Sequence, residues 1–166
     1  MNKRPHAIGM LILWTLLIAA VDQGIKGLVL ATMQGKSHLI IPGIFSLSYR
    51  ENTGAAFSMF NEMHIAVLLG LNLLVLVFFI YLIRPYLQAR PGQFAAVLVL
   101  GGALGNLVDR VVRRHVIDYL DFHVWPVFNL ADAFIVAGVA LLVWLILRDE
   151  RAKIDRSPDV PGGSTT

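Results

Sequence analysis

Five aspartates and one lysine stand within or beside long apolar runs, where a charged side chain is costly. Lys26 follows an aspartate at helical i, i+4 spacing. Two carboxylates that lie close together do not both ionise easily, so one can act as a general base on water while its protonated partner polarises a carbonyl. Asp118 with Asp132 is the favoured pair, and the spacing alone leaves three other candidates, Asp22, Asp109 and Asp121.

Other catalytic chemistries fit the sequence poorly. The chain has no cysteine, which excludes a thiolate nucleophile, a cysteine metal site and a disulfide. His115 and His123 belong to no HExxH-like pattern, so we expect no metal and no other cofactor. No G-x-S-x-G motif surrounds Ser46, Ser48 or Ser58, and a serine nucleophile therefore has no support.

Four apolar runs must position these polar residues. The chain has 166 residues, of which 57% are apolar and 15% charged, which is more apolar than ordinary soluble domains. A bilayer core of about 30 Å needs about 20 helical residues to cross it. We therefore predict an all-α integral membrane protein with four transmembrane helices in a single domain, 1–148. The expected spans are about 8–30, 64–83, 94–112 and 129–148.

The basic residues predict how the chain is inserted. Four spans place both termini on one side, together with most of the lysines and arginines outside the spans. The positive-inside rule then puts both termini in the cytoplasm, although a basic cluster around Arg113 on the other side weakens the contrast. The residues on the side of the termini are Lys3, Arg4, Arg84, Arg90, Arg148, Arg151, Lys153 and Arg156.

Three of the expected helices carry polar groups to the same depth. At about 1.5 Å of rise per residue, Asp22, Asn106 and Asp132 lie about 18 to 23 Å from the cytoplasmic side, near the outer surface. Charged groups at this depth face the bundle interior, pair with each other, or line a wet cavity. A shared site satisfies this requirement. A structural Asp22–Lys26 ion pair and a helix end at Asp109 would satisfy it as well.

Two outer segments, 37–60 and 113–128, complete the region. In the first, Pro42-Gly43 is a turn signal and residues 45–50 alternate apolar with polar, which predicts a small β-structured element on the outer surface between helices one and two. Gly54 either lets a substrate backbone approach closely or simply forms a tight turn.

The second segment contains aromatic residues typical of an interfacial belt, among them Tyr119 and Trp125. Asn129 follows it and can cap the fourth helix. The polar residues 149–166 are expected to form a disordered cytoplasmic tail.

Five motifs occur in order along the chain, and together they resemble those of the lipoprotein signal peptidases, the type II signal peptidases of bacterial inner membranes. One position departs from the family pattern, because Ile25 precedes Lys26 where a small hydroxyl residue is common. This puts in doubt only a local hydroxyl hydrogen bond. The motifs are Asp22-Gln23-x-x-Lys26, Asn52-Thr53-Gly54-Ala55-Ala56-Phe57, the glycine-rich run GGALGNLxDR at 101–110, Val116-Ile117-Asp118-Tyr119 and Phe128-Asn129-Leu130-Ala131-Asp132.

The resemblance implies a membrane aspartyl endopeptidase that removes the signal peptide of prolipoproteins just before a diacylglyceryl-modified cysteine, without a metal. It implies Asp118 and Asp132 as the catalytic pair. The expected partners are lipid-modified prolipoproteins, membrane lipids and globomycin-like inhibitors. The resemblance also implies binding or supporting positions, namely Asn52, Gly54, Asn106, Arg110, Asn129, Ala131, Asp22 and Lys26.

A protein of another class, a small proton-coupled transporter or channel, would also explain intramembrane Asp22, Lys26 and Asp132. It predicts internal repeats or a polar path to the cytoplasm, whereas the inner halves of three spans are apolar and no repeat is evident. A membrane-embedded assembly factor would need no carboxylate pair. No nucleic-acid partner is expected, because the net charge of +3 comes without a dense basic run.

Overall fold

The computed structural model describes residues 4–53 and 65–156. Among these residues, four helices are long and apolar enough to span a membrane, over Ile8–Met33, Leu69–Tyr86, Arg90–Val112 and Leu130–Ile154, which confirms the predicted fold class. In chain order the elements are α1 (Arg4–Met33), β1 (Ser37–Ile41), β2 (Phe45–Asn52), α2 (Ile65–Ile83), the 3-10 turn η2 (Arg84–Tyr86), α3 (Arg90–Val112), β3 (Val116–Asp121) and α4 (Leu130–Arg156).

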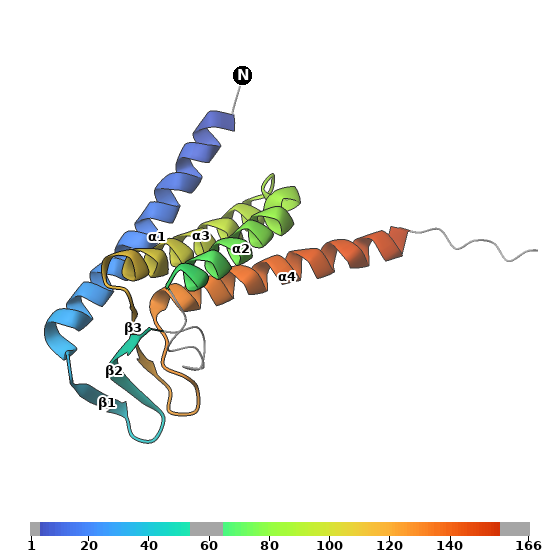
Figure 1. The fold of residues 1–166 in the computed structure, drawn as a ribbon. Helices are drawn as coiled ribbons and strands as arrows, with labels where there is room; N and C mark the ends of the chain where they lie inside the picture. Colours follow the sequence, from blue (N-terminus) through green and yellow to red (C-terminus); the bar gives the residue numbers. More distant parts are fainter. Residues whose placement is uncertain (1–3, 54–64, 157–166) are drawn as a thin grey trace, which may run out of the picture.

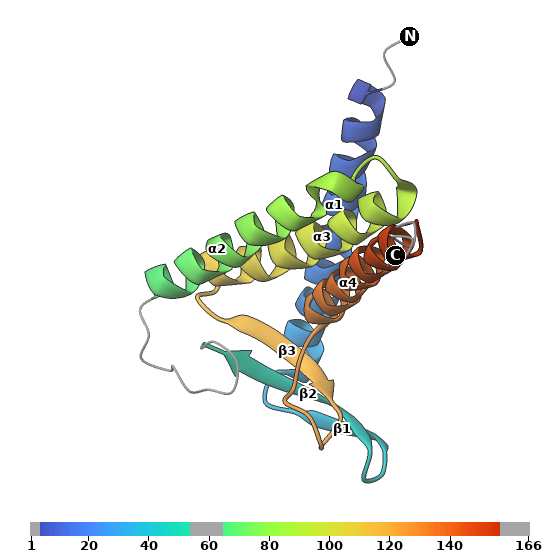
Figure 2. The same ribbon diagram turned by 90° about the vertical axis from the view of Figure 1, so that its right-hand side faces the viewer.

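Helix α3 is the centre of the bundle and packs against α1, α2 and α4 (Figures 1 and 2). Small residues allow this close approach. A Cβ on Gly102 would lie only 2.4 Å from the carbonyl oxygen of Ala131, so the α3 and α4 backbones nearly touch there. Figure 1 shows that α1, α3 and α4 meet beside the sheet and diverge toward their other ends.

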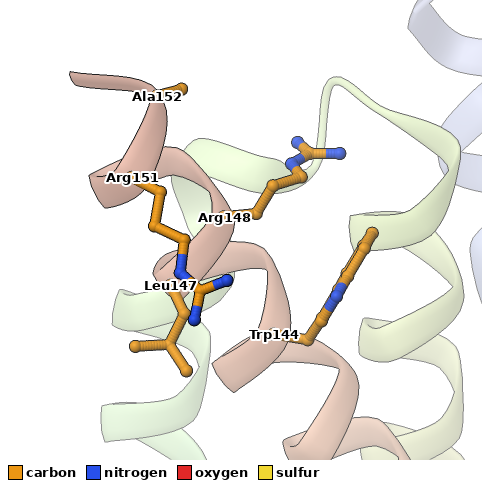
Figure 3. Close-up of a pocket in the computed structure, with 5 residues that line it drawn as sticks. All are labelled: Trp144, Leu147, Arg148, Arg151 and Ala152. Atoms are coloured by element: carbon orange, nitrogen blue, oxygen red, sulfur yellow. The ribbon is translucent and has the colours of Figure 1, made fainter. Parts of the chain in front are cut away.

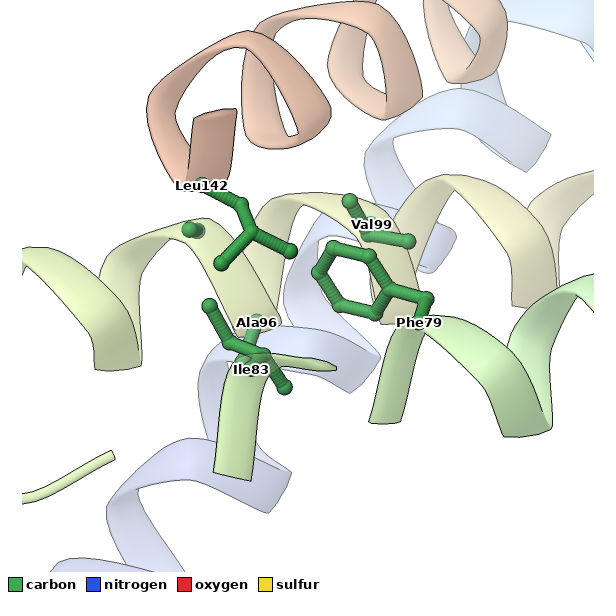
Figure 4. Close-up of a cluster of buried hydrophobic side chains, with 6 residues drawn as sticks. Phe79, Ile83, Ala96, Val99 and Leu142 are labelled. Atoms are coloured by element: carbon green, nitrogen blue, oxygen red, sulfur yellow. The ribbon is translucent and has the colours of Figure 1, made fainter. Parts of the chain in front are cut away.

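An apolar cluster joins α2, α3 and α4 (Figure 4). Phe79 and Ile83 of α2 pack there against Ala96 and Val99 of α3 and Leu142 of α4. Of the α2 side chains whose burial the structure describes, most other apolar ones point outward; Leu74, for example, is 64% exposed. Such an outer surface suits lipid, as expected for a membrane span.

The sheet has three antiparallel strands in the order β1-β2-β3. The predicted β element between α1 and α2 supplies β1 and β2, whereas β3 comes from the connection between α3 and α4. This strand was not predicted from the sequence. Its first four residues are all buried, and Ile117 and Tyr119 pack against Val29 and Met33 of α1. A strand covered on both faces lacks the period-two alternation that identified β2.

Helix α4 continues to Arg156, so the prediction of a disordered tail from residue 149 is wrong for 149–156. Most of these residues, such as Glu150, Ala152 and Lys153, are good helix formers, and none is Gly or Pro. Lys153 Nζ also lies 2.6 Å from Glu150 Oε1 at i, i+3 spacing. The remainder of the tail, 157–166, lies outside the described residues.

Candidate active site

The polar residues named above come from five elements that meet where the helices reach the sheet. The second half of α1 supplies Asp22 and Lys26, and the last turns of α3 supply Asn106, Asp109 and Arg110. Asn52 ends β2, Asp118 lies in β3, and Asn129, Ala131 and Asp132 stand at the start of α4. The structure thus brings most of the predicted residues together. Gly54 lies outside the described residues.

Lys26 is fully buried at the centre of this region. Its Nζ lies 2.8 Å from Asp22 Oδ2 and 2.9 Å from Asp109 Oδ2, and donates a 2.8 Å hydrogen bond to Asn106 Oδ1. Two ion pairs and one hydrogen bond thus hold the ammonium group. The i, i+4 pair is therefore a structural ion pair and, at the same time, part of the shared site, since it contacts Asn106.

Asn106 connects this charge cluster to Asp132. Its Oδ1 accepts hydrogen bonds from Lys26 and, at 3.2 Å, from Asn129 Nδ2. Its Nδ2 can then point only the other way, where it donates to Asp132 Oδ1 at 2.7 Å. The two donors on Oδ1 thus fix the orientation of the amide.

Asp118 is held by two amides and is 3% exposed. Asn129 Nδ2 donates to its Oδ1 at 2.6 Å, and Asn52 Nδ2 donates to its Oδ2 at 2.9 Å. Burial raises the pKa of Asp118 to about 6; the hydrogen bond from Asn52 opposes this shift, and the charge of Asp132 adds to it. Asp118 is therefore a carboxyl group that keeps its proton up to about pH 6, well above the usual range.

The first turn of α4 has a partner for each of its leading N–H groups. Leu130 N donates to the hydroxyl of Tyr119 at 3.3 Å, and Ala131 N donates to Asp22 Oδ1 at 3.0 Å. Asp132 N donates to Asn129 Oδ1 at 3.0 Å, so Asn129 caps α4 as predicted. Tyr119 is 4% exposed and so is no member of an interfacial belt. Its role is to orient α4.

Two further polar residues of this network were not identified from the sequence. Gln23 Nε2 donates to Gly105 O at 2.9 Å and to Asp109 Oδ1 at 3.0 Å. Arg113 Nη1 pairs with Asp109 Oδ1 and donates to Gln23 Oε1 at 2.9 Å. The sequence did contain patterns that point to both residues, since Gln23 adjoins Asp22 and Arg113 stands at i, i+4 from Asp109.

Arg110 and Asp121 differ in whether they lie near the Asp118–Asp132 pair. The half-buried Arg110 donates a 3.5 Å hydrogen bond to Asn106 O, and its charge interacts with those of Asp132 and Asp118. Asp121 instead accepts hydrogen bonds from Ser48 Oγ of β2 at 3.3 Å and from His123 N, just after β3, at 2.9 Å. These bonds of Asp121 do not involve the amides that link Asp118 to Asp132.

Metal ligands are not clustered in the part of the chain that the structure describes, where no group of three or more His, Cys, Asp or Glu side chains could hold an ion. His123 Nε2 lies 2.9 Å from Ser46 Oγ, and His115 Nδ1 lies 4.0 Å from Glu51 Oε2. The two histidines therefore have separate partners on the sheet.

Four membrane-spanning helices with buried carboxylates and amides at one end form the kind of site that an aspartyl peptidase embedded in a membrane requires. The chain belongs to the signal peptidase II family, because the family model described as Signal peptidase (SPase) II matches residues 14–148. Membership in a peptidase family leaves the transporter alternative without support.

Individual relatives and solved structures agree with this assignment. The lipoprotein signal peptidase of Azoarcus sp. (strain BH72) is 38% identical over 96% of each chain. That of Moorella thermoacetica is 40% identical over 82% of this chain and 91% of its own. A bacterial membrane enzyme solved by the in meso method superposes with a TM-score of 0.75 and 28% identity, covering 88% of this chain and 92% of that one.

Proposed function

We propose that this peptidase removes the signal peptide from diacylglyceryl-modified prolipoproteins by cutting just before the lipidated cysteine, with Asp118 and Asp132 as the catalytic pair. The names of the relatives support the substrate class. One observation carries the choice of residues: Asp118 and Asp132 are linked through the amides of Asn129 and Asn106, by hydrogen bonds of 2.6, 3.2 and 2.7 Å.

The surroundings of the two carboxyls favour different roles. Asp118 holds the shared proton, because burial raises its pKa to about 6. Asp132 is the base, since it lies in the first turn of α4, where the helix dipole favours a negative charge, and since the charge of Arg110 acts on it.

Each step of the hydrolysis then has a donor and an acceptor. Asp132 takes a proton from water while the water oxygen bonds to the scissile carbonyl carbon, and Asp118 gives its proton to the carbonyl oxygen. When the tetrahedral intermediate collapses, the carbonyl re-forms and returns that proton to Asp118. The C–N bond breaks, and Asp132 protonates the departing amine. Both carboxyls end in their starting states.

The remaining residues hold the substrate or the catalytic pair. Arg110, Asn52 and Gly54 are proposed to contact the substrate backbone or an inhibitor of the globomycin type. Asn106 and Asn129 orient the two carboxyls, and the small side chain of Ala131 leaves room beside them. Lys26 holds Asn106 in place and Asp22 pairs with Lys26, which agrees with the 2.8 Å hydrogen bond from Lys26 Nζ to Asn106 Oδ1.

The proposed location is the bacterial inner membrane, with residues 1–148 as one embedded domain. Both termini would be cytoplasmic and the catalytic pair would lie near the periplasmic face. The bias of basic residues toward the side of the termini supports this orientation. The placement of the sheet beside the candidate site and at the far end from the α4 C-terminus agrees with it (Figure 1).

The test replaces each proposed catalytic residue by its amide and measures cleavage of a lipid-modified precursor in detergent or membranes. Asp118→Asn and Asp132→Asn should each lower kcat on the order of 10² to 10⁴-fold, the usual contribution of an acid or base. Asp121→Asn is the matched control, because its carboxylate bonds Ser48 of β2 and the backbone of His123. This variant should stay within about threefold of wild type.

Two results would overturn the assignment: a folded Asp118→Asn or Asp132→Asn variant with near-normal turnover, or an Asp121→Asn variant as impaired as they are. The wild type should also keep its activity in a metal chelator. Loss of activity that added metal restores would contradict the proposed two-carboxylate reaction.

A further inference from the structure

The far end of α4 carries a pocket that the catalytic proposal does not use. It has a volume of about 310 Å³ and is lined by Trp144, Leu147, Arg148, Arg151 and Ala152 (Figure 3). The pocket lies toward the C-terminal end of a helix whose N-terminal turn holds Asp132. It is therefore separate from the candidate active site.

Arginine and tryptophan side chains give this pocket both a charged and an aromatic lining. Trp144 is 53% exposed, and the guanidinium carbon of Arg148 lies 5.3 Å from the centre of its ring. Figure 3 shows Arg148 on the same side of the helix as Trp144, whereas Arg151 extends alongside Leu147. A guanidinium can bind a phosphate through two parallel hydrogen bonds, and tryptophan prefers the depth of lipid headgroups.

An apolar stripe on α4 leads to these arginines. Val136, Val139, Val143 and Leu147 follow one another at intervals of three and four residues and are 68%, 40%, 48% and 55% exposed. One turn further along the same face comes Arg151. Eleven residues of helix rise about 17 Å, which is close to one leaflet of a bilayer core of about 30 Å. The stripe is thus as long as the apolar part of one leaflet.

We propose that this face of α4 binds an anionic phospholipid. Its phosphate meets the guanidinium groups of Arg151 and Arg148; the latter also donates to Asp149 Oδ1 through Nε and Nη2, at 3.3 and 3.1 Å. The glycerol region of the lipid lies against Trp144, and an acyl chain follows the stripe from Leu147 toward Val136. Free phosphate would meet the same arginines but has no apolar part to cover the stripe, so the lipid is the occupant that accounts for both features. Basic pockets beside membrane helices bind anionic headgroups for the same reason.

Lipid retention by the purified full-length protein tests this proposal. Native mass spectrometry would compare the binding of phosphatidylglycerol with that of phosphatidylcholine. Each arginine near an anionic lipid should contribute about fivefold in affinity, so Arg148→Gln with Arg151→Gln should weaken phosphatidylglycerol binding about 25-fold. Trp144→Leu should weaken the binding of both lipids without removing the preference between them. These exposed positions should leave thermal unfolding nearly unchanged.

Lys153→Gln is the matched control for Arg151→Gln, because both remove one positive charge from the same end of α4. Lys153 does not line the pocket, and its Nζ pairs with Glu150. Its replacement should change binding less than twofold. Equal losses in the two variants would show general charge attraction and overturn the proposal. Equal binding of the two lipids, or full displacement of the lipid by millimolar inorganic phosphate, would overturn it as well.

Discussion

Asn129 Nδ2 lies 2.6 Å from Asp118 Oδ1, so the residue that caps α4 also holds a carboxyl group of β3. The same side chain accepts a 3.0 Å hydrogen bond from Asp132 N through its Oδ1. One amide therefore uses its donor on one proposed catalytic residue and its acceptor on the backbone of the other. The position of Asp118 relative to the start of α4 therefore depends in part on this side chain, beside the backbone bonds that join Leu120 to Phe128.

Two replacements of Asn129 separate these roles. Serine is a good N-cap but is too short to reach Asp118, whereas alanine loses both contacts. We expect kcat to fall on the order of 10²-fold in Asn129→Ser and in Asn129→Ala, as for the loss of one oriented donor. Only Asn129→Ala should lose a further ~1 kcal/mol of unfolding free energy in detergent. Near-normal kcat in Asn129→Ser would show that the bond to Asp118 is dispensable.

The stability of the fold should depend on the protonation of Asp118. Because burial raises its pKa from 3.8 to about 6, the fold favours the neutral form; this stabilisation is complete below pH 3.8 and is lost as the pH rises through 6. The difference of about two pKa units corresponds to about 3 kcal/mol. Asp118→Asn cannot titrate, so its unfolding free energy relative to wild type should rise by about that amount between pH 3.5 and 8. A difference that stays constant with pH would refute the raised pKa.

The buried charge cluster of Lys26, Asp22 and Asp109 should tolerate the loss of a cation and an anion together better than the loss of the cation alone. Lys26→Met leaves Asp22 and Asp109 buried with one cation too few, and breaking a buried pair in this way costs about 3–5 kcal/mol. Asp22→Asn in the same chain removes the excess negative charge, while Arg113 still neutralises Asp109. Equilibrium unfolding should therefore find the double variant more stable than Lys26→Met alone. If the stability losses of the two single variants simply add in the double variant, the unpaired buried charge is not what destabilises Lys26→Met.

The membrane made the helices and the depth of the site predictable. Apolar runs and the helical rise are local properties, so the four spans and the common level of Asp22, Asn106 and Asp132 followed from the sequence. The contacts within that level did not. Lys26 could be recognised as a partner of Asp22 from i, i+4 spacing, but its contacts with Asp109 and Asn106 depend on how two helices pack.

The outer segments were harder to predict than the spans. β2 was visible because one of its faces is polar, whereas β3 is buried on both sides and gave no alternation. The first half of the second segment was therefore interpreted as interfacial, and the buried role of Tyr119 was missed. The extension of α4 past residue 148 was missed for another reason: charged residues resembled a solvated tail, although they form helical pairs such as Glu150–Lys153.

Gly105 allows α1 to approach α3 at the charge cluster. A Cβ at this position would lie 2.5 Å from Asp22 Oδ2, so Gly105→Ala should displace a carboxylate that Lys26 and Ala131 N both contact. Overpacking of this kind costs about 1–3 kcal/mol. Gly24→Ala is the matched control, because no atom lies within 4 Å of its Cβ. The melting temperature in detergent should be lower for Gly105→Ala and unchanged or slightly higher for Gly24→Ala. Equal melting temperatures would contradict the close approach.

Arg114 has a backbone conformation that favours glycine. Its φ is 66°, in the left-handed region, which costs an ordinary residue about 1–2 kcal/mol. Arg114→Gly should therefore raise the unfolding free energy by up to ~1 kcal/mol, reduced by the greater freedom of glycine in the unfolded chain. The neighbouring Arg113 has φ of −104° and an ion pair with Asp109, so Arg113→Gly should be destabilising. If both glycine variants shift stability in the same direction, the backbone at Arg114 is not the source of the strain.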